Sequence, residues 1–469
     1  MKQLFAVFLT FFAAQSFGQK DKFPKLLNYY NSEKNFNGVA LVATNGQIDY
    51  LKGIGISNRQ SGTIINSKAK FKIASVTKTF TALMIIQLME EGKVNLNRTI
   101  GQYLPEYSGE AKDRATIENL ITYSSGIPNC ESYINDDIYL KPISMDSFIV
   151  KYCSGKLEAA PGTKFNYDNG DYIILGKIIE KLTGKTYREN LKERILGPLG
   201  MSNTDMLDSK DIVTGLVQSY SFDDSLKTFN ADKPYYIENF FSAGSMYSTV
   251  EDLLKFDQGI FTFKLLKKET VDLMLTPHSK LENTGLGFWV SNKYGGLDTK
   301  FAYRPGGIYG ARANWIHVID SNRTIIVLSN TNATNLFEMS EQLNAIATNQ
   351  KTNIPESPKQ KTAKKVDIEK LKGTWVIDLR PGPNSEVYLQ DLLITETKGD
   401  SFSGVFYGTS FTSGKVNTAW EFIYFAFTTH DRENVYYHSG YIDGDKIMGI
   451  SYSADRNFIS HWTGIKKIK

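Results

Sequence analysis

One stretch of this chain constrains its fold more than any other, because it requires a helix surrounded by protein. From Thr79 to Glu91 the residues are apolar at nearly every position, including Phe80, Leu83 and Ile86. A helix that is hydrophobic on all sides is stable only when neighbouring elements cover all of it. We therefore expect residues 79–91 to form a central helix inside a large core.

Ser75 and Lys78 stand immediately before this run. Side chains three apart on a helix share one face, with Cβ atoms roughly 5–6 Å apart. Burial lowers the pKa of a lysine, and a neutral lysine can take the proton from a serine hydroxyl, which is otherwise a weak nucleophile. Taken alone, Ser-x-x-Lys also fits a serine that caps a helix beside a solvated lysine, so the rest of the chain must decide.

Three further segments follow in order: residues 120–128, 161–170 and 303–310. Together with Ser75-x-x-Lys78 they resemble the serine β-lactamase superfamily, in the branch of class C β-lactamases, D-alanyl-D-alanine carboxypeptidases and related esterases. The likeness covers roughly residues 25–345. It implies an α+β penicillin-recognition fold, in which an antiparallel sheet is flanked by helices and a helical region carries the Ser75 helix.

The resemblance also implies a role for each motif residue. Ser75 would attack a carbonyl carbon and form an acyl-enzyme, with either Lys78 or Tyr167 as the base. Asn169 would hold Lys78 and a substrate amide. The backbone N–H groups of Ser75 and Gly307 would form an oxyanion hole. By contrast, we expect Asp168, Ser124 and Ser125 to brace turns.

The third segment departs from the family pattern. Arg304-Pro305-Gly306 stands where the family usually has Lys-Thr-Gly or His-x-Gly. Arg304 could bind a substrate carboxylate, favour the Tyr167 phenolate, or be a surface residue, and arginine does not simply replace lysine. Pro305 removes a backbone donor from what we expect to be an edge strand. Gly306 and Gly307 either let a substrate approach closely or only form a turn.

Two functions of different classes fit these residues. The first is an exported serine hydrolase working through an acyl-enzyme on Ser75, with peptide substrates of the D-Ala type (cell-wall peptides), esters or β-lactams. The second is a binding or sensor protein that keeps the fold but has lost turnover through Arg304 and Pro305. In a third possibility the C-terminal part binds sugar or lipid and the hydrolase is its accessory.

The N-terminus predicts export. Lys2 precedes an apolar run over residues 4–14, followed by small and polar residues to position 19. About 11 apolar residues are too few to span a bilayer, which needs about 20, so residues 1–19 are interpreted as a signal peptide. No later run is long enough for a membrane span. We expect a protein that is periplasmic or secreted after cleavage.

Composition limits the kinds of partner and cofactor that we expect the protein to bind. The net charge is +4 and the basic residues are dispersed, which does not favour nucleic acid. The five histidines lack metal-ligand spacing, so we expect no metal and no cofactor. Cys130 and Cys153 either form a disulfide or stay as two separate thiols.

The chain divides by composition into residues 20–350, a linker at 351–366 and a C-terminal antiparallel β domain at 367–469. The short strands of this last part predict a small barrel or sandwich, similar to lipocalin-like modules through residues 371–375 and 440–449. Five of its aromatic residues are expected in the core: Trp420, Phe422, Tyr424, Phe425 and Phe427. Elsewhere the pattern predicts helices at 169–182, 187–196, 249–256 (capped by Thr249) and 337–347, strands at 286–290, 311–320 and 324–329, and hairpin turns at 45–46 and 443–444. Strands at both ends of residues 20–350, with helices between them, predict one sheet that joins the N- and C-terminal segments.

Overall fold

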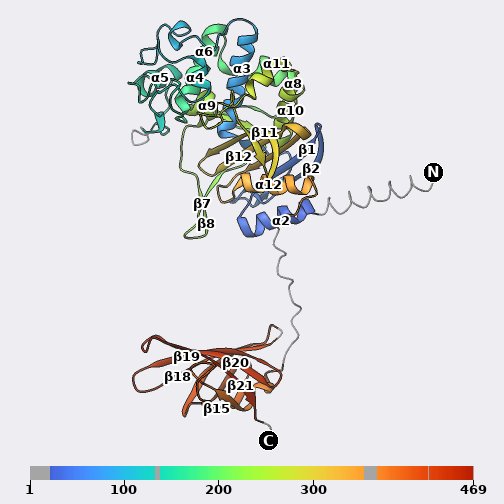
Figure 1. Ribbon diagram of the computed structural model, residues 1–469, viewed down its shortest axis with the longest axis vertical. Coiled ribbons are helices and arrows are strands. Elements are labelled where there is room, and N and C mark those ends of the chain that lie inside the picture. Colours follow the sequence, from blue (N-terminus) through green and yellow to red (C-terminus); the bar gives the residue numbers. More distant parts are fainter. Residues whose placement is uncertain (1–21, 133–137, 353–366, 421, 468–469) are drawn as a thin grey trace, which may run out of the picture. The chain divides into compact units, whose positions relative to one another are not determined.

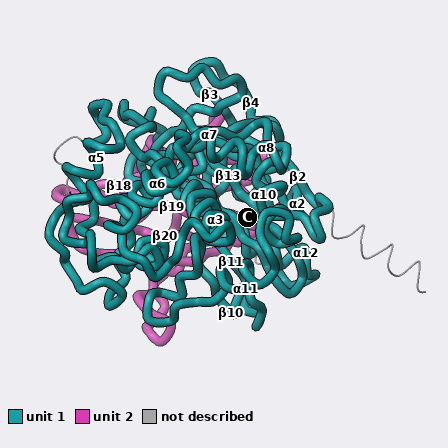
Figure 2. The backbone as a smooth tube through the Cα atoms, turned by 90° about the horizontal axis from the view of Figure 1, so that it is seen from above, with its two compact units in different colours: residues 1–355 teal, residues 356–469 magenta. Residues whose placement is uncertain are grey.

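A computed structural model describes residues 22–132, 138–352, 367–420 and 422–467. The chain forms two compact units, residues 1–355 and 356–469, drawn as ribbons in Figure 1 and in separate colours in Figure 2. The division falls within the segment 351–366 that composition predicts to be a linker. Most of this segment and the predicted signal peptide lie outside the described residues, so both stay predictions.

The first unit is built on a six-stranded antiparallel sheet with strand order β10-β11-β12-β13-β1-β2. Asn45 and Gly46 join the first two strands with φ of 52° and 74°, the left-handed conformation that the predicted hairpin turn requires. Because β1 pairs with β13, the two ends of the unit share one sheet, as the sequence predicts. The strands are β1 (Gly38–Thr44), β2 (Gln47–Ile54), β10 (Trp289–Tyr294), β11 (Leu297–Ile308), β12 (Ala311–Val318) and β13 (Arg323–Ser329).

Both faces of this sheet are covered. Side chains alternate along β1, so Val39 and Leu41 join the large core while Ala40 and Val42 join a second core with the terminal helices. These helices are α2 (Lys22–Lys34) and α12 (Leu336–Ala347), and Figure 1 shows them on one side of the sheet with the helical region on the other. Burial on both faces explains why β1 is apolar throughout.

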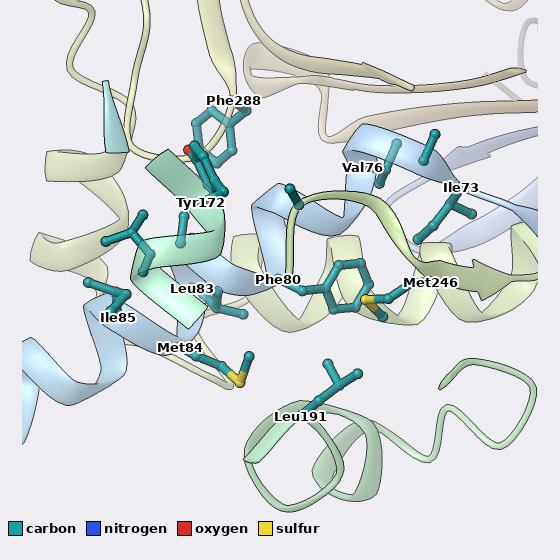
Figure 3. Packing of buried hydrophobic residues seen from close by; sticks show 14 of the residues in the cluster. Ile73, Val76, Phe80, Leu83, Met84, Ile85, Tyr172, Leu191, Met246 and Phe288 are labelled. Carbon is teal, nitrogen blue, oxygen red and sulfur yellow. The ribbon is translucent and has the colours of Figure 1, made fainter. Parts of the chain in front are cut away.

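The helical region surrounds α3 (Thr77–Glu90), the helix that the apolar run predicts. Its residues from Thr77 to Ile86 are all buried, and Figure 3 shows Phe80 and Leu83 among side chains from several neighbouring elements. The other helices are α4 (Ile117–Ile121), α5 (Met145–Tyr152), α6 (Asn169–Thr183), α7 (Tyr187–Leu191), the π-helical turn η4 (Lys192–Leu196), α8 (Gly197–Leu199), α9 (Phe241–Gly244), α10 (Val250–Phe261) and α11 (Lys268–Met274).

Short elements connect these layers. They are the 3₁₀ turns η1 (Ala74–Val76), η2 (Ile100–Gln102), η5 (Ile237–Phe240) and η6 (Ile319–Ser321), and the strands β3 (Ile56–Asn58), β4 (Thr63–Ile64), β5 (Phe71–Lys72), β6 (Asp205–Met206), β7 (Tyr220–Asp223), β8 (Thr228–Ala231) and β9 (Met246–Ser248). β5 pairs with β9 just before η1 and so anchors the approach to Ser75.

Several boundaries differ from the predictions. The helix predicted at 249–256 is capped by Thr249 as expected but continues to Phe261. The helix predicted at 187–196 changes at Lys192 from α-helical to π-helical hydrogen bonding. The strand predicted at 286–290 begins only at Trp289, because Gly287 has a φ of 102° that interrupts an extended run.

The second unit is a closed antiparallel barrel, as one of the two predicted architectures requires. Its strands are β14 (Gly373–Asp378), β15 (Leu389–Lys398), β16 (Ser401–Phe406), β17 (Thr409–Asn417), β18 (Ile423–His430), β19 (Val435–Asp443), β20 (Lys446–Ser453) and β21 (Phe458–Lys466), preceded by the turn η7 (Ile368–Leu371). β14 pairs with β21 and thereby removes both edges.

The predicted aromatic core of the barrel was partly wrong. Phe425 and Phe427 are buried inside it. Tyr424 is 38% exposed because alternate residues of β18 point outward, and Trp420 is 56% exposed because it lies before that strand begins.

Among the described residues, no helix combines the length and apolarity that crossing a membrane requires. In the same residues no group of three or more His, Cys, Asp or Glu is placed to hold a metal ion. Cys130 and Cys153 are both buried free thiols.

Candidate active site

Ser75 lies in η1, where this turn runs into α3. The residue before it, Ala74, has a φ of 48°, a left-handed conformation that costs an alanine roughly 1–2 kcal/mol. Such strain persists only where the surroundings enforce it, and it gathers at functional sites. Ser75 is partly exposed, whereas Lys78 one turn later is fully buried. The hydroxyl is therefore reachable from outside while its amine neighbour is not.

Lys78 is held by three oxygen atoms. Its Nζ lies 3.1 Å from Ser75 Oγ and donates to Asn169 Oδ1 at 2.6 Å and to the carbonyl oxygen of Ala243 at 2.9 Å. Burial lowers the pKa of Lys78, aided by the charge of Arg304 and opposed by other neighbours. The lowered pKa favours the neutral amine, the form that can take the proton of the serine hydroxyl.

Tyr167 completes the contact with the serine. Its hydroxyl donates to Ser75 Oγ at 2.7 Å, and Lys78 Nζ lies 5.0 Å from the centre of its ring. Burial alone would raise the pKa of Tyr167, but the charges of Lys78 and Arg304 outweigh burial and lower it. Tyr167 therefore has the nearby cations that a tyrosine needs to act as a base.

Asn169 is the first residue of α6, and Asp168 caps this helix by accepting from the Asp171 N–H. The bracing role expected for Asp168 fits this contact. Asn169 holds Lys78 as expected, but its amide nitrogen donates to Glu131 Oε1 at 2.7 Å and contacts Tyr139 Oη at 3.4 Å. The N–H groups assigned to a substrate amide are thus occupied within the protein.

Glu131 is a site residue that sequence reasoning missed. It precedes an undescribed segment and belongs to none of the four motifs, so no local pattern marks it. Together with Tyr139, Gly307 and Tyr309 it lines a cavity of about 440 Å³ beside the site. The carboxylate thus faces the space that a substrate could use.

Arg304 is fully buried, so the interpretation as a surface residue was wrong. Its Nε donates to the Ser75 carbonyl oxygen at 2.9 Å, and its Nη2 lies 2.5 Å from Tyr123 Oη and 3.3 Å from Tyr167 Oη. The guanidinium stacks over Trp289, 4.7 Å from the ring centre. With no exposed surface, Arg304 is placed to influence Tyr167 rather than to meet a substrate carboxylate.

Tyr123 is a second residue that the motif comparison did not single out. It is buried with a φ of 55°, and its ring packs 4.7 Å from that of Tyr167. Within the same segment Ser125 braces the region as expected, since its hydroxyl donates to Asp171 Oδ1 at 2.6 Å. Ser124 likewise bonds only locally, with its hydroxyl 3.0 Å from that of Thr122.

The third motif lies on β11. We expected an edge strand here, and this was wrong, because β10 and β12 flank β11 in the sheet. Pairing with β10 nevertheless stops at Tyr303, so Pro305 needs no donor on that side. A Cβ at Gly306 would lie 2.3 Å from the Ile73 carbonyl oxygen and 3.1 Å from Ser75 N. Only glycine lets β11 approach the serine backbone this closely.

Gly307 is the next residue of β11 and faces a different neighbour. A Cβ there would lie 3.0 Å from an Arg312 guanidinium nitrogen, the end of a flexible side chain. The structure thus brings six predicted residues to one place, with Gly307 next along β11: Ser75, Lys78, Tyr167, Asn169, Arg304 and Gly306.

The site contains a serine that is bonded to a buried lysine and to a tyrosine, next to an antiparallel sheet. This arrangement defines the class of penicillin-recognition proteins. The chain belongs to the Beta-lactamase family, whose model matches residues 20–349. It is 26% identical over 369 residues to penicillin-binding protein 4* of Bacillus subtilis (strain 168), covering 73% of this chain and 79% of that protein. It is 27% identical over 262 residues to teichoic acid D-alanine hydrolase of Staphylococcus aureus, covering 55% and 63%.

Among solved structures, an octameric penicillin-binding protein homologue from Pyrococcus abyssi aligns with a TM-score of 0.61 and 21% identity. The alignment covers 95% of this chain and 99% of that chain, which establishes a shared fold. Membership of this family, together with these relatives, supports the interpretation of the protein as a hydrolase.

Proposed function

We propose that the protein is an exported serine hydrolase that forms an acyl-enzyme on Ser75 and acts on esters or amides of D-alanine type. The observation that carries this proposal is the double contact of Ser75 Oγ, 2.7 Å from Tyr167 Oη and 3.1 Å from Lys78 Nζ. Two groups of lowered pKa on one hydroxyl provide a base for attack and an acid for the leaving group. Export rests on the predicted signal peptide.

The chemistry would proceed in two steps. Ser75 Oγ attacks the substrate carbonyl carbon and gives its proton to Lys78 or Tyr167, while the Ser75 and Gly307 N–H groups receive the developing oxyanion. The carbon–oxygen or carbon–nitrogen bond to the leaving group breaks as that group takes the proton back through Tyr167. Water then repeats the sequence on the ester of Ser75, releasing the acid and restoring the hydroxyl.

The substrate class follows from two charged residues. Arg304 has no exposed surface, and its Nε and Nη2 are bonded to Ser75, Tyr123 and Tyr167, so its guanidinium is not placed to meet a substrate carboxylate. Glu131, which is bonded to Asn169 beside Ser75, presents a carboxylate to the neighbouring cavity, and Lys233 also lines this cavity. This favours substrates that carry a cationic amine near the scissile carbonyl, as a D-alanyl ester does, over peptides with a free C-terminal carboxylate. The relative named teichoic acid D-alanine hydrolase is consistent with this preference.

One observation favours the alternative of a binding or sensor protein. Both N–H groups of Asn169 that could hold a substrate amide contact Glu131 and Tyr139. Such a protein would acylate slowly or keep its acyl group.

The test is the intact mass of the mature protein after exposure to a fluorophosphonate and, separately, to a penicillin. Ser75→Ala is the loss variant, and Ser57→Ala, a partly exposed serine outside the site, is the control. We expect an adduct of one equivalent that disappears only in Ser75→Ala. Release of D-alanine from a D-alanyl ester, measured in parallel, distinguishes turnover from trapping. No adduct with either reagent would refute the proposal.

A further inference from the structure

The barrel of the second unit contains a cavity that plays no part in the proposed hydrolysis. Its volume is about 480 Å³, within the range of about 300–1,000 Å³ that is usual for small-molecule sites. Its lining combines exposed aromatic rings at the mouth with buried polar groups at the floor. The barrel is described completely around this cavity, with all eight strands paired in a closed ring.

The floor of the cavity is polar and internally bonded. His438 is buried, with Nε2 2.8 Å from Thr429 Oγ1 and Nδ1 2.7 Å from Ser451 Oγ. Trp462 Nε1 also donates to Ser451 Oγ at 2.8 Å. Burial lowers the pKa of His438 to about 4, so its ring is neutral at physiological pH. The floor is therefore a polar surface of neutral groups that are bonded to one another.

Below the floor the barrel is filled. Its interior holds tightly packed large side chains, among them Phe402, Phe411, Phe425, Phe427 and Trp375. Filled interiors are usual for eight-stranded barrels of this size. An aliphatic chain has no apolar tunnel to enter, so the cavity is a cup and not a deep lipid site.

Aromatic rings form the walls of the cup. Tyr388, Tyr407 and Phe458 are 43%, 54% and 41% exposed, although rings of this size are usually covered. The Tyr388 and Tyr407 hydroxyls bond to each other, which holds the two rings in a fixed T-shaped arrangement with an interplanar angle of 70°. Preorganised aromatic faces of this kind lose little entropy when a flat ligand stacks on them.

Directional polar groups stand at the rim. Tyr436 Oη donates to Asp431 Oδ2 at 2.7 Å and accepts from Arg456 Nη1 at 3.0 Å. The rim thus holds a carboxylate, a guanidinium and phenols within hydrogen-bonding reach of one another.

From these observations we infer that the cup binds a saccharide, specifically a β-linked oligosaccharide of gluco configuration. Such a ring has two apolar C–H faces that can stack on tyrosine and phenylalanine, and a belt of equatorial hydroxyl groups that needs donors and acceptors at its edges. The cup supplies both. A fatty acid would match neither the polar floor nor the closed interior.

The test measures binding of cellotetraose and chitotetraose to the full mature chain by calorimetry and by saturation-transfer NMR. Palmitate serves as a competing ligand of lipid type. Tyr407→Ala removes an exposed wall ring. Tyr437→Ala is the matched control, because Tyr437 is 53% exposed on β19 but points away from the cup. Tyr388→Ala is a second wall variant, and the melting temperature of each variant verifies folding.

We expect at least one tetrasaccharide to bind with a dissociation constant below about 1 mM, weakened about tenfold or more by each wall variant and less than about twofold by Tyr437→Ala. Three results would overturn the inference: no tetrasaccharide binding with a dissociation constant below about 1 mM, equal weakening by Tyr437→Ala, or displacement of the sugar by palmitate. Hydrolysis at Ser75 is expected to be unchanged in all three variants, which separates this result from the proposed function.

Discussion

Replacing Arg304 by glutamine removes a buried positive charge from the neighbourhood of Tyr167 while keeping a side chain that can donate hydrogen bonds. The charge lies where it favours the phenolate, with Nη2 3.3 Å from Tyr167 Oη. It also lowers the pKa of Lys78, to which burial makes the largest contribution. Whichever of the two groups is the base, the loss of Arg304 raises its pKa.

The distance sets the size of the effect. Two unit charges at 3.3 Å interact by about 5 kcal/mol at an effective dielectric constant of about 20. The guanidinium spreads its charge over three nitrogen atoms, so we take about half of this, 2 to 3 kcal/mol. That corresponds to a loss of roughly 30- to 150-fold in kcat/KM.

The assay is the pH profile of kcat/KM on an activated ester for wild type, Arg304→Gln and Arg304→Lys. A base must be deprotonated to act, so a raised pKa moves the acid limb of the Arg304→Gln profile to higher pH. Arg304→Lys keeps the charge and loses the planar fork that contacts Ser75 and Tyr123 together, so its acid limb stays near that of wild type.

Two results would refute the reasoning. In the first, Arg304→Gln stays within about threefold of wild type across the whole pH range. In the second, Arg304→Lys loses as much activity as Arg304→Gln with the same displaced limb, which would make geometry and not charge the cause. Melting temperatures of the three proteins establish that the comparison is made between folded enzymes.

Three more predictions follow from buried contacts. Glu131→Gln keeps an acceptor for Asn169 but removes a negative charge that raises the pKa of Lys78. The acid limb of the kcat/KM profile should therefore move to lower pH. A limb that moves to higher pH, or does not move, would contradict this. Gly306→Ala should lower kcat/KM by about 10²–10³, because the added methyl group forces β11 away from the serine backbone. Gly307→Ala meets only the end of a flexible side chain, so its loss of kcat/KM should be smaller. Equal losses of the two variants in steady-state assays would argue against the close approach of β11. Burial and the neighbouring Asp168 carboxylate raise the pKa of Asp171 well above its ordinary value of about 4. Between about pH 4 and this raised pKa the folded state keeps a proton that the unfolded chain releases. The free energy of unfolding of the wild type therefore falls as the pH rises between these two limits. Asp171→Asn should therefore raise the melting temperature by about 2 °C or more at pH 8 and by much less at pH 4.5, and a pH-independent difference would disprove the linkage.

Local sequence determined the elements whose stability is local. The apolar run after Lys78 predicted α3, because a helix with no polar face must be surrounded. Asn45-Gly46 predicted the first hairpin and Thr249 predicted the start of α10, because a left-handed turn and a helix cap depend on a few adjacent residues. The order of the four motifs likewise identified the family to which the chain belongs.

Tertiary structure decided what depends on distant contacts. Arg304 looked equally suited to the surface, to a substrate or to Tyr167, and its place was fixed by contacts with residues 229 and 137 positions away. Glu131 lies in none of the four motifs and Tyr123 was not singled out within its motif, since their importance comes from an amide and a guanidinium delivered by other segments. The cup in the barrel exists because strand closure brings β16, β18, β19 and β20 to one end. Periodicity records which face of an element is buried, but it carries no information about which distant side chain will lie opposite.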